Sequence, residues 1–182
     1  MGVLTKIPLR WFNSAGFLAC TALLGYAYYL ELHEGLEPCP LCIFQRVGVI
    51  VVGIVFLAAA LHNPGRFGRR IYGVLIALTA AAGASISGRH LWIQSLPADQ
   101  VPNCGADLEY LLEMLPIIEV IKRVFTHSGE CADIVWSFLG LTMPGWVLIW
   151  FIGMGAVGLV INWTAERKQR SLIAHHLTKR AK

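Results

Sequence analysis

Charged residues are scarce in this sequence. They make up only 14% of the 182 residues, whereas ordinary globular domains carry about 25%. Hydrophobic residues make up 56%, and long apolar runs pass without a single charge. The helices of a soluble bundle need polar faces, so this scarcity argues against a soluble all-α protein and favours a membrane protein.

Four stretches are long enough to cross a bilayer core, which needs about 20 mostly apolar residues. Arg46 is the one charged residue within them. They cover about residues 12–30, 43–61, 71–88 and 144–163. The first resembles a signal peptide because basic residues precede it, but it is long and continues through LLGYAYYL without a convincing cleavage site. We predict an all-α integral membrane protein, a single transmembrane domain over residues 1–182 that forms a four-helix bundle.

Basic residues are distributed unevenly along the chain. Eleven of the 15 Lys and Arg lie at the N-terminus (Lys6, Arg10), between the second and third stretches, and in the tail 167–182. Four spans place all three groups on one side, which the positive-inside rule makes cytoplasmic. Both termini are then cytoplasmic, and loops 31–42 and 89–143 lie outside. The basic groups are explained by anionic lipid and need no nucleic-acid partner.

Several cofactor and metal motifs are missing. No flavin or nicotinamide fingerprint is present, and haem attachment would need a histidine where Ile43 stands. A zinc site would need a second close pair of ligands, but Cys104 and Cys131 are 27 positions apart, with no suitably spaced histidine beside either. The pair Cys39–Cys42 therefore favours redox chemistry and no bound metal, although a metal site and purely structural disulfides remain alternatives.

Four of the five cysteines fall in the predicted outer loops, and only Cys20 lies inside an apolar stretch. In a bacterium this face is the oxidising periplasm, where disulfides persist. A disulfide between Cys39 and Cys42 would close a very small ring and so remove little chain entropy, which argues against a static structural role. We expect Cys20 to be a small packing residue.

Cys42 lies near the first turn of the second span, because Pro38 and Pro40 mark non-helical chain before it. The positive end of the helix favours a thiolate there. Arg46 follows on the same face, about 6 Å further along the axis. This arginine either extends back to the head groups or holds an anion, such as the Cys42 thiolate or a reduced acceptor ring. A lipid-soluble quinone is the natural two-electron acceptor for a dithiol at this boundary.

The third stretch ends in SGRHLWIQ on the same outer face. His90, and less directly Arg89, are candidates to give the acceptor a proton or a hydrogen bond. Anchoring at the membrane interface, with Trp92 in the aromatic belt, is the alternative.

The second outer loop contains DLEYLLEMLPIIEVIKRVF, in which leucines recur at helical spacing until Pro116 interrupts the pattern. We expect a short helix on the outer membrane surface, although packing against the bundle is equally compatible. The flanks QVPNCGAD and HSGECAD predict that Cys104 and Cys131 lie on mobile backbone.

The segments PCPLCIFQRV and GECADIVWSFLGLTMPGW, with one cysteine pair in each outer loop, resemble the bacterial disulfide bond formation protein B (DsbB) family over essentially the whole chain. The resemblance implies an inner-membrane enzyme, a quinone-dependent protein dithiol oxidoreductase that reoxidises DsbA, a periplasmic thioredoxin-fold protein. It also implies that Cys104 forms the mixed disulfide and that Cys39–Cys42 reoxidises Cys104–Cys131. Cys42 would adjoin ubiquinone or menaquinone, with Arg46 and His90 in the quinone site.

Two other functional assignments are compatible with the sequence. A thiol oxidoreductase resembling vitamin K epoxide reductase also uses a four-helix bundle and paired cysteines, but its Cys-x-x-Cys generally comes late in the chain, whereas Cys39–Cys42 opens the second span. The other alternative is a non-enzymatic membrane scaffold that binds a metal through its four outer cysteines.

Overall fold

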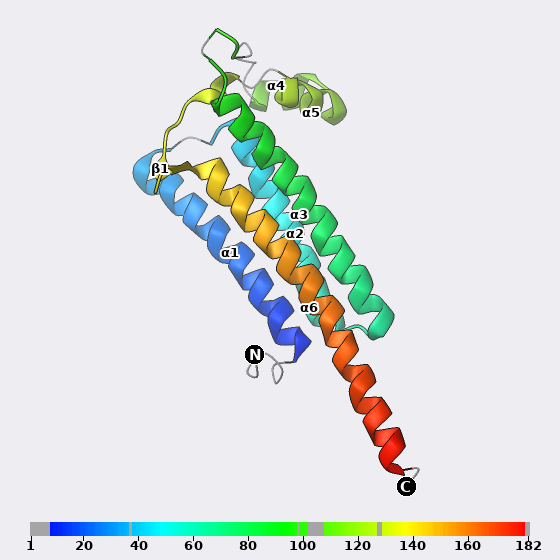
Figure 1. The fold of residues 1–182 in the computed structure, drawn as a ribbon. Coiled ribbons are helices and arrows are strands. Elements are labelled where there is room, and N and C mark those ends of the chain that lie inside the picture. Colours follow the sequence, from blue (N-terminus) through cyan, green and yellow to red (C-terminus); the bar gives the residue numbers. More distant parts are fainter. Residues whose placement is uncertain (1–7, 37, 98, 102–107, 127–128, 181–182) are drawn as a thin grey trace.

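The computed structural model describes residues 8–36, 38–97, 99–101, 108–126 and 129–180; for 108–109 and 165–180 it describes the backbone alone. Four long helices run side by side, as Figure 1 shows. They are α1 (Leu9–Glu34), α2 (Pro40–His62), α3 (Arg66–Gln94) and α6 (Met143–Arg180). All four are long and apolar enough to cross a membrane, α6 through its portion Met143–Thr164. The predicted four-helix membrane bundle is confirmed.

Local sequence explains where the helices begin and end. Cys39 precedes α2 in an extended conformation, and Pro40 occupies the first helical position, where its missing N–H costs no hydrogen bond. At the other end of α2, Asn63 adopts the left-handed conformation and donates its N–H to the carbonyl of Ala59. Gly35 ends α1 in the same conformation, which glycine adopts without steric cost.

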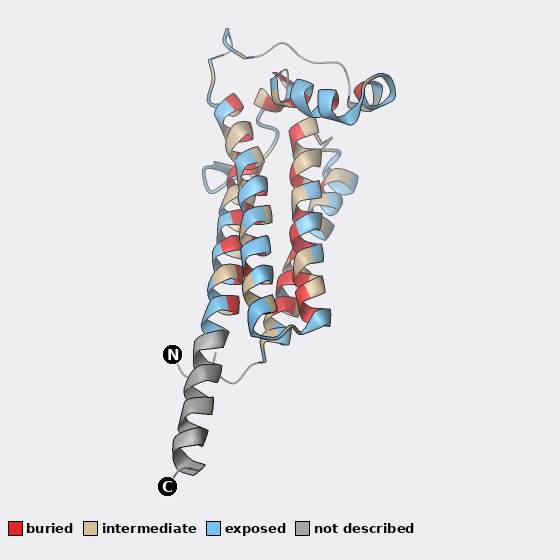
Figure 2. Cartoon of the chain, turned by 90° about the vertical axis from the view of Figure 1, so that its right-hand side faces the viewer, coloured by how far each residue is buried: buried red, intermediate tan, exposed pale blue. Residues whose placement is uncertain are grey.

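Small residues let the helices pack closely. A methyl group on Gly83 of α3 would overlap the ring of Phe151 on α6, and one on Gly16 of α1 would lie 2.6 Å from Phe56 on α2. Cys20 is buried in this same core, as the sequence led us to expect. Figure 2 shows buried residues on the facing sides of the helices and exposed residues outside. Because at most 33% of any apolar window is buried within the protein, the remaining apolar surface is available to lipid.

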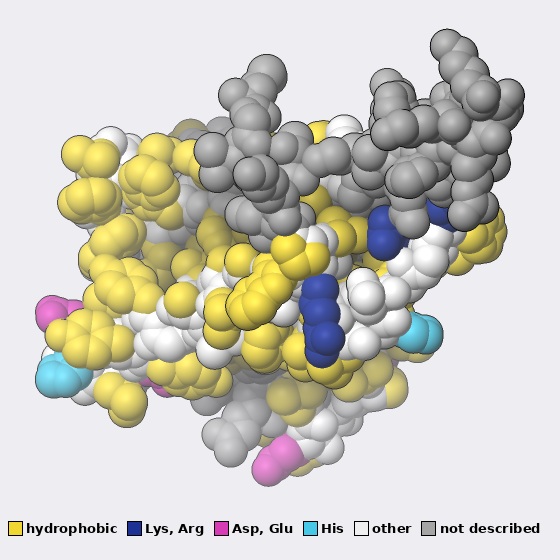
Figure 3. Space-filling view, turned by 90° about the horizontal axis from the view of Figure 1, so that it is seen from below, with side chains coloured by type: hydrophobic (Ala, Val, Ile, Leu, Met, Phe, Trp, Pro, Cys, Tyr) yellow, Lys and Arg dark blue, Asp and Glu magenta, His cyan; other side chains and the backbone are white. Residues whose placement is uncertain are grey.

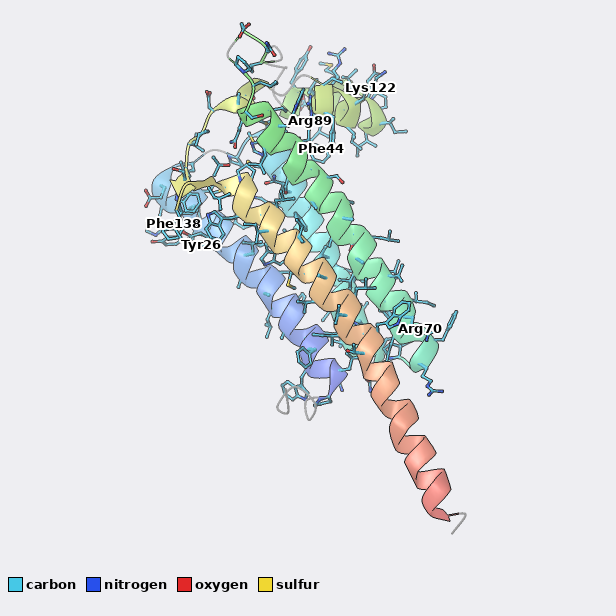
Figure 4. All side chains as sticks on the ribbon, in the orientation of Figure 1. Tyr26, Phe44, Arg70, Arg89, Lys122 and Phe138 are labelled. Carbon is cyan, nitrogen blue, oxygen red and sulfur yellow. The ribbon has the colours of Figure 1, made fainter. Side chains whose placement is uncertain are left out.

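One end of the bundle carries the second loop. Helices α4 (Leu108–Met114) and α5 (Ile117–Thr126) lie across this end instead of along the bundle (Figures 1 and 2). The sequence led us to expect one short helix with a break or kink at Pro116; the break is present, and a second helix, α5, follows it. The side chain of Arg89 on α3 donates two hydrogen bonds to the carbonyl of Phe125, at 3.0 and 3.2 Å, and stacks on Trp92 at 4.1 Å. In Figure 4, Arg89 lies where α3 meets α5, so this arginine attaches the second loop to the bundle.

A short hairpin, which the sequence analysis did not predict, precedes α6. Strands β1 (Ser137–Phe138) and β2 (Leu141–Thr142) pair antiparallel around Leu139 and Gly140, both at positive φ. Trp146 of α6 donates its indole N–H to the carbonyl of Phe138 at 3.1 Å and so fixes the hairpin on the helix. Figure 4 shows Phe138 at the same level of the bundle as Tyr26 of α1.

The opposite end of the bundle holds the start of α1 and the end of α6 (Figure 1). Viewed from this end, Figure 3 shows basic side chains among hydrophobic ones. Arg70 at the start of α3, labelled in Figure 4, lies over the ring of Trp163 at 5.2 Å. A buried contact between Asn162 and Asn13, at 3.4 Å, links α6 to α1 near this end. Polar contacts of this kind hold helices together in a lipid environment, where apolar attraction between them is weak.

Candidate active site

The two thiols of the Cys-x-x-Cys segment lie at the N-terminus of α2. Their sulfur atoms are 2.9 Å apart, and the Sγ of Cys39 accepts a hydrogen bond from the backbone N–H of Cys42 at 3.4 Å. Cys39 therefore caps the helix, while Cys42 belongs to its first turn. Unpaired N–H groups give a helix N-terminus a partial positive charge, which favours an anionic sulfur at this position.

Cys131 lies against this pair. It belongs to the 3₁₀ helix η1 (Gly129–Ala132) and packs in an apolar cluster with Leu41, Ile93 and Val124. Hydrogen bonding to Cys131 and to Cys42, together with burial, raises the pKa of Cys39 above that of an ordinary thiol. The second loop thus brings one of its cysteines to Cys39.

The structure differs from our expectation that Cys131 sits on mobile backbone. Its exposed fraction is 1%, because the apolar face of α5 and the ends of α2 and α3 enclose it. The Gly and Ser residues beside it in the sequence indicated a loop but gave no sign of this burial. Cys104, the other predicted cysteine of the loop, lies outside the described residues.

His90 is buried beside the thiols, with 2% of its surface exposed. Its Nε2 lies 3.8 Å from the Sγ of Cys39 and 3.2 Å from the carbonyl oxygen of Cys131, and its Nδ1 lies 3.5 Å from the amide nitrogen of Gln45. An amide nitrogen only donates, so Nδ1 accepts and the ring proton resides on Nε2. His90 can therefore donate a hydrogen bond toward Cys131 and Cys39. Gln45, whose role the sequence did not reveal, orients the ring.

Arg46 has a partner that the sequence analysis did not identify. Its Nη1 forms an ion pair with Glu31 Oε2 at 2.5 Å, and its guanidinium lies over the ring of Tyr28 at 4.9 Å. The two charged side chains are 18% and 32% exposed. An arginine within a membrane span usually has a partner, so the acidic residues that end α1, only a short loop away, were the available signal.

An apolar cavity of about 340 Å³ lies between α1, α2, α6 and the segment before the hairpin. Five of its lining residues carry ionisable or amide groups: Tyr26, Glu31, Cys42, Gln45 and Arg46. The rest are mainly apolar or aromatic, among them Leu24, Ala27, Val49, Trp136, Val147 and Trp150. His90 does not line this cavity and belongs instead to the cluster around Cys39. The structure therefore places Cys42 and Arg46 together at the cavity, whereas His90 lies outside the cavity lining, on the side of Cys39.

Three of these residues also have the spacing of metal ligands. One ligand atom from each of Cys39, Cys42 and His90 lies within 4.8 Å of the others. The sequence did not reveal this set, because His90 is 48 positions from the nearer cysteine.

A four-helix membrane bundle that holds a dithiol between a buried cysteine and an apolar cavity defines a membrane protein of thiol–disulfide chemistry. Comparison with known proteins gives the family. Residues 9–161 match the family model described as "Disulfide bond formation protein DsbB". The chain belongs to the DsbB family and is a DsbB-type disulfide bond formation protein.

Curated relatives named "Disulfide bond formation protein B" agree with this assignment. The relative from Nitrosococcus oceani is 49% identical over 154 residues, which cover 85% of this chain and 91% of the relative. That from Methylococcus capsulatus is 51% identical over 84% of this chain and 93% of its own length. That from Xanthomonas euvesicatoria pv. vesicatoria is 44% identical over 93% of this chain and 99% of its own length. Membership of this family implies thiol oxidoreductase activity in disulfide formation.

Proposed function

We propose that the chain is an inner-membrane enzyme that reoxidises a periplasmic DsbA-type thioredoxin-fold protein and passes the electrons to a membrane quinone. One observation carries this proposal: the two thiols of one pair face different surroundings. Cys39 contacts Cys131 of the second loop, whereas Cys42 lines the apolar cavity. A dithiol placed in this way can receive electrons from a protein disulfide on one side and release them into the membrane on the other.

The protein side of the reaction proceeds by disulfide exchange. A thiolate of the partner attacks Cys104 of a Cys104–Cys131 disulfide, which joins the two proteins and releases Cys131 as a thiolate. Cys131 then attacks Cys39 of the Cys39–Cys42 disulfide, so a bond between Cys131 and Cys39 forms and Cys42 leaves. The N-terminus of α2 and the nearby guanidinium of Arg46 favour this leaving thiolate.

The second exchange releases the oxidised partner and restores the loop disulfide Cys104–Cys131. The other partner thiol releases Cys104, which attacks Cys131, re-forms the loop disulfide and frees Cys39. The Nε2–H group of His90, 3.8 Å from the Cys39 sulfur, is placed to stabilise the departing thiolate. The partner has then lost two electrons and two protons, which the thiols Cys39 and Cys42 carry until their own disulfide re-forms.

The cavity residues fit a quinone. A bound quinone would accept the two electrons and two protons of the reduced Cys39–Cys42 pair. Arg46 retains donors beyond the one paired with Glu31, because a guanidinium carries five N–H groups. Arg46 and Gln45 would donate to the quinone's carbonyl oxygens, and the apolar residues from α1, α2 and α6 would exclude water.

The proposed membrane orientation follows from charge. The basic end of the bundle faces the cytoplasm, together with both termini, and the end that carries α4, α5 and the thiols faces the periplasm. Alkaline phosphatase fused after residue 101 is expected to be active, and green fluorescent protein fused after residue 182 is expected to fluoresce. The reverse result would contradict this orientation.

A single reconstituted assay tests the proposed function. Purified protein is mixed with a reduced thioredoxin-fold dithiol protein and ubiquinone-1, and loss of the quinone absorbance is followed. Cys42→Ser is expected to abolish quinone reduction, and Cys104→Ser to abolish the trapped complex with the partner. Cys20→Ala, in the core, serves as the control and is expected to retain turnover. Wild-type turnover in Cys42→Ser would reject the proposal.

A further inference from the structure

We infer that the fully reduced protein binds one thiophilic divalent cation, such as Zn²⁺, through Cys39, Cys42 and His90, and that the bound cation blocks reoxidation of the pair. The inference concerns regulation of the same site. It depends on the proposed function for the inhibition but not for the binding. Thiolate and imidazole are the ligands that tetrahedral zinc sites favour.

The distances fit such a site with little movement. In a tetrahedral site with ordinary zinc–ligand bonds, two sulfurs lie about 3.8 Å apart, and a sulfur and a nitrogen about 3.5 Å apart. The Sγ of Cys39 and the Nε2 of His90 are 3.8 Å apart, close to that value. The sulfurs of Cys39 and Cys42, at 2.9 Å, need to separate by about 0.9 Å, and the ligand atoms of Cys42 and His90 lie within 4.8 Å of each other.

The surroundings of His90 also fit a metal ligand. A histidine that binds zinc through Nε2 usually donates its Nδ1–H group to a second residue, which fixes the ring. Gln45 lies in this position, 3.5 Å from Nδ1, and is itself buried. A half-turn of its amide places the oxygen there in place of the nitrogen, so Nδ1 donates and Nε2 is free to bind a cation.

Charge and the remaining coordination position favour binding as well. Two thiolates balance the charge of a divalent cation, so the buried complex of Cys39, Cys42 and His90 is neutral. Because the Cys39 thiol hydrogen-bonds to Cys131, the sulfur of Cys131 is within reach of the fourth position of the tetrahedron.

Binding depends on the redox state of the pair. In the Cys39–Cys42 disulfide neither sulfur is a thiolate, and the thiolate is the form that binds metal. Conversely, a bound cation occupies the sulfur electron pairs that would form the disulfide and holds the two sulfurs apart. Zn²⁺ therefore traps the reduced pair until a chelator removes it.

Cobalt binding tests the site without partner or quinone. Purified protein, fully reduced or with the Cys39–Cys42 disulfide formed, is titrated with Co²⁺, which gives thiolate charge-transfer and tetrahedral absorption bands. We expect one Co²⁺ per reduced chain, no such bands in the oxidised protein, and at least tenfold weaker binding in His90→Gln. His62→Gln, at the opposite end of α2, is the matched control and is expected to bind as the wild type does.

Zinc competition and turnover complete the test. Zn²⁺ is expected to displace Co²⁺ and to slow reoxidation of the reduced pair by ubiquinone-1 at least tenfold, with recovery on addition of EDTA. If His90→Gln fails to fold, Gln45→Leu, which removes the orienting amide, is expected to weaken binding instead. Equal bands in oxidised protein, or unchanged affinity in both variants, would overturn the site. If Zn²⁺ binds but does not slow reoxidation, the proposed inhibition is wrong and the binding site stands. A protein that binds Co²⁺ but never reduces quinone would instead contradict the proposed function.

Discussion

Cys39 combines three roles at one sulfur atom. It caps α2 through the Cys42 amide, lies 3.8 Å from His90 and hydrogen-bonds to Cys131. The Cys42 amide and His90 donate toward this sulfur, whereas the thiol proton of Cys39 favours the contact with Cys131, so the protonation state of Cys39 determines which contact is strongest. At the scale of single residues, Cys39 is therefore the junction between the second loop and the bundle.

The raised pKa of Cys39 predicts a shifted alkylation profile. Its hydrogen bonds to Cys131 and Cys42 favour the thiol, so the folded protein retains a proton that the unfolded chain releases around the ordinary thiol pKa of 9.0. The pH midpoint for alkylation of Cys39 in the reduced protein is expected to lie above 9.0. Mass spectrometry after brief iodoacetamide pulses measures it. By the same linkage, stability from this group is complete below the unfolded pKa and is lost as pH rises toward the folded value.

The ion pair of Glu31 with Arg46 leads to a second prediction at the residue scale, which concerns the affinity for quinone. The carboxylate of Glu31 holds Arg46 at the edge of the cavity, and loss of one such contact costs about 1 kcal/mol, or roughly fivefold in affinity. Glu31→Ala is expected to raise the KM for ubiquinone-1 by about that factor and to leave partner oxidation unchanged. Glu31→Gln, whose oxygen still accepts from Arg46, is expected to restore most of the affinity. Equal KM values in all three proteins would contradict a positioning role.

At the scale of elements, short segments between the spans shape the site. The segment η1 carries Cys131, and α5 covers this cysteine. The hairpin β1–β2 lies beside the cavity, because Trp136 just before it and Trp146 just after it both line the cavity. The hairpin turn contains Leu139 at φ +52 and Gly140 at φ +78. A leucine in the left-handed region costs about 1 kcal/mol, so the backbone conformation of Leu139 lowers the stability of the hairpin.

Two substitutions test the strain in the turn. Leu139→Asn is expected to stabilise the hairpin by about 0.5–1 kcal/mol, because asparagine tolerates positive φ. Gly140→Ala is expected to destabilise it by at least about 1 kcal/mol. Hydrogen exchange of the hairpin amides measures both effects. Gly88→Ala, on α3 with open space around it, is the control, and exchange that changed equally in all three variants would exclude a local cause.

At the scale of the whole molecule, the bundle depends on glycines that admit aromatic rings. Phe151 is fully buried and fills the space that Gly83 leaves on α3. Around this contact α3 and α6 run side by side through the bundle (Figure 1), and the cavity lies at one end of the bundle, between α6, α1 and α2.

Gly83→Ala is expected to lower the stability of the bundle. The added methyl group overlaps the ring of Phe151, and overpacking of this kind costs about 1–3 kcal/mol. The midpoint of thermal unfolding in detergent micelles measures the loss. Gly153→Ala, whose methyl group meets no atom within 4 Å, is expected to keep or slightly raise the midpoint, and a similar loss in both variants would contradict a packing origin.

The bundle could be predicted because its signal is local. An apolar run long enough to cross a membrane is visible within about 20 residues, and the position of Cys42 at a helix entrance follows from the adjacent prolines. The contacts of Arg46 with Glu31 and of His90 with Cys39 depend on how helices rotate against one another. No periodicity within one helix encodes this rotation, so the sequence indicated Arg46 and His90 as site residues and the acidic end of α1 as a source of partners for Arg46, but it did not specify either contact.

The burial of Cys131 and the hairpin were harder to predict for different reasons. Cys131 is enclosed by residues from α2, α3 and α5 that are distant in sequence, while its own neighbours are turn-forming. The hairpin has strands of two residues each and a Leu-Gly turn instead of the Asn-Gly that signals such turns. Trp146 of α6 supports the hairpin through its hydrogen bond to Phe138, a contact that the sequence of the hairpin itself does not reveal.

The cap on α2 gives the redox cycle a backbone signature. In the reduced pair the sulfurs of Cys39 and Cys42 are 2.9 Å apart, whereas a disulfide holds them about 2 Å apart, so the sulfur that accepts the Cys42 amide proton moves when the redox state changes. Each exchange of electrons at Cys39 therefore loosens or tightens the first turn of a membrane-spanning helix. The nitrogen-15 resonance of that single amide would then report, from within the bilayer boundary, how many electrons the enzyme holds.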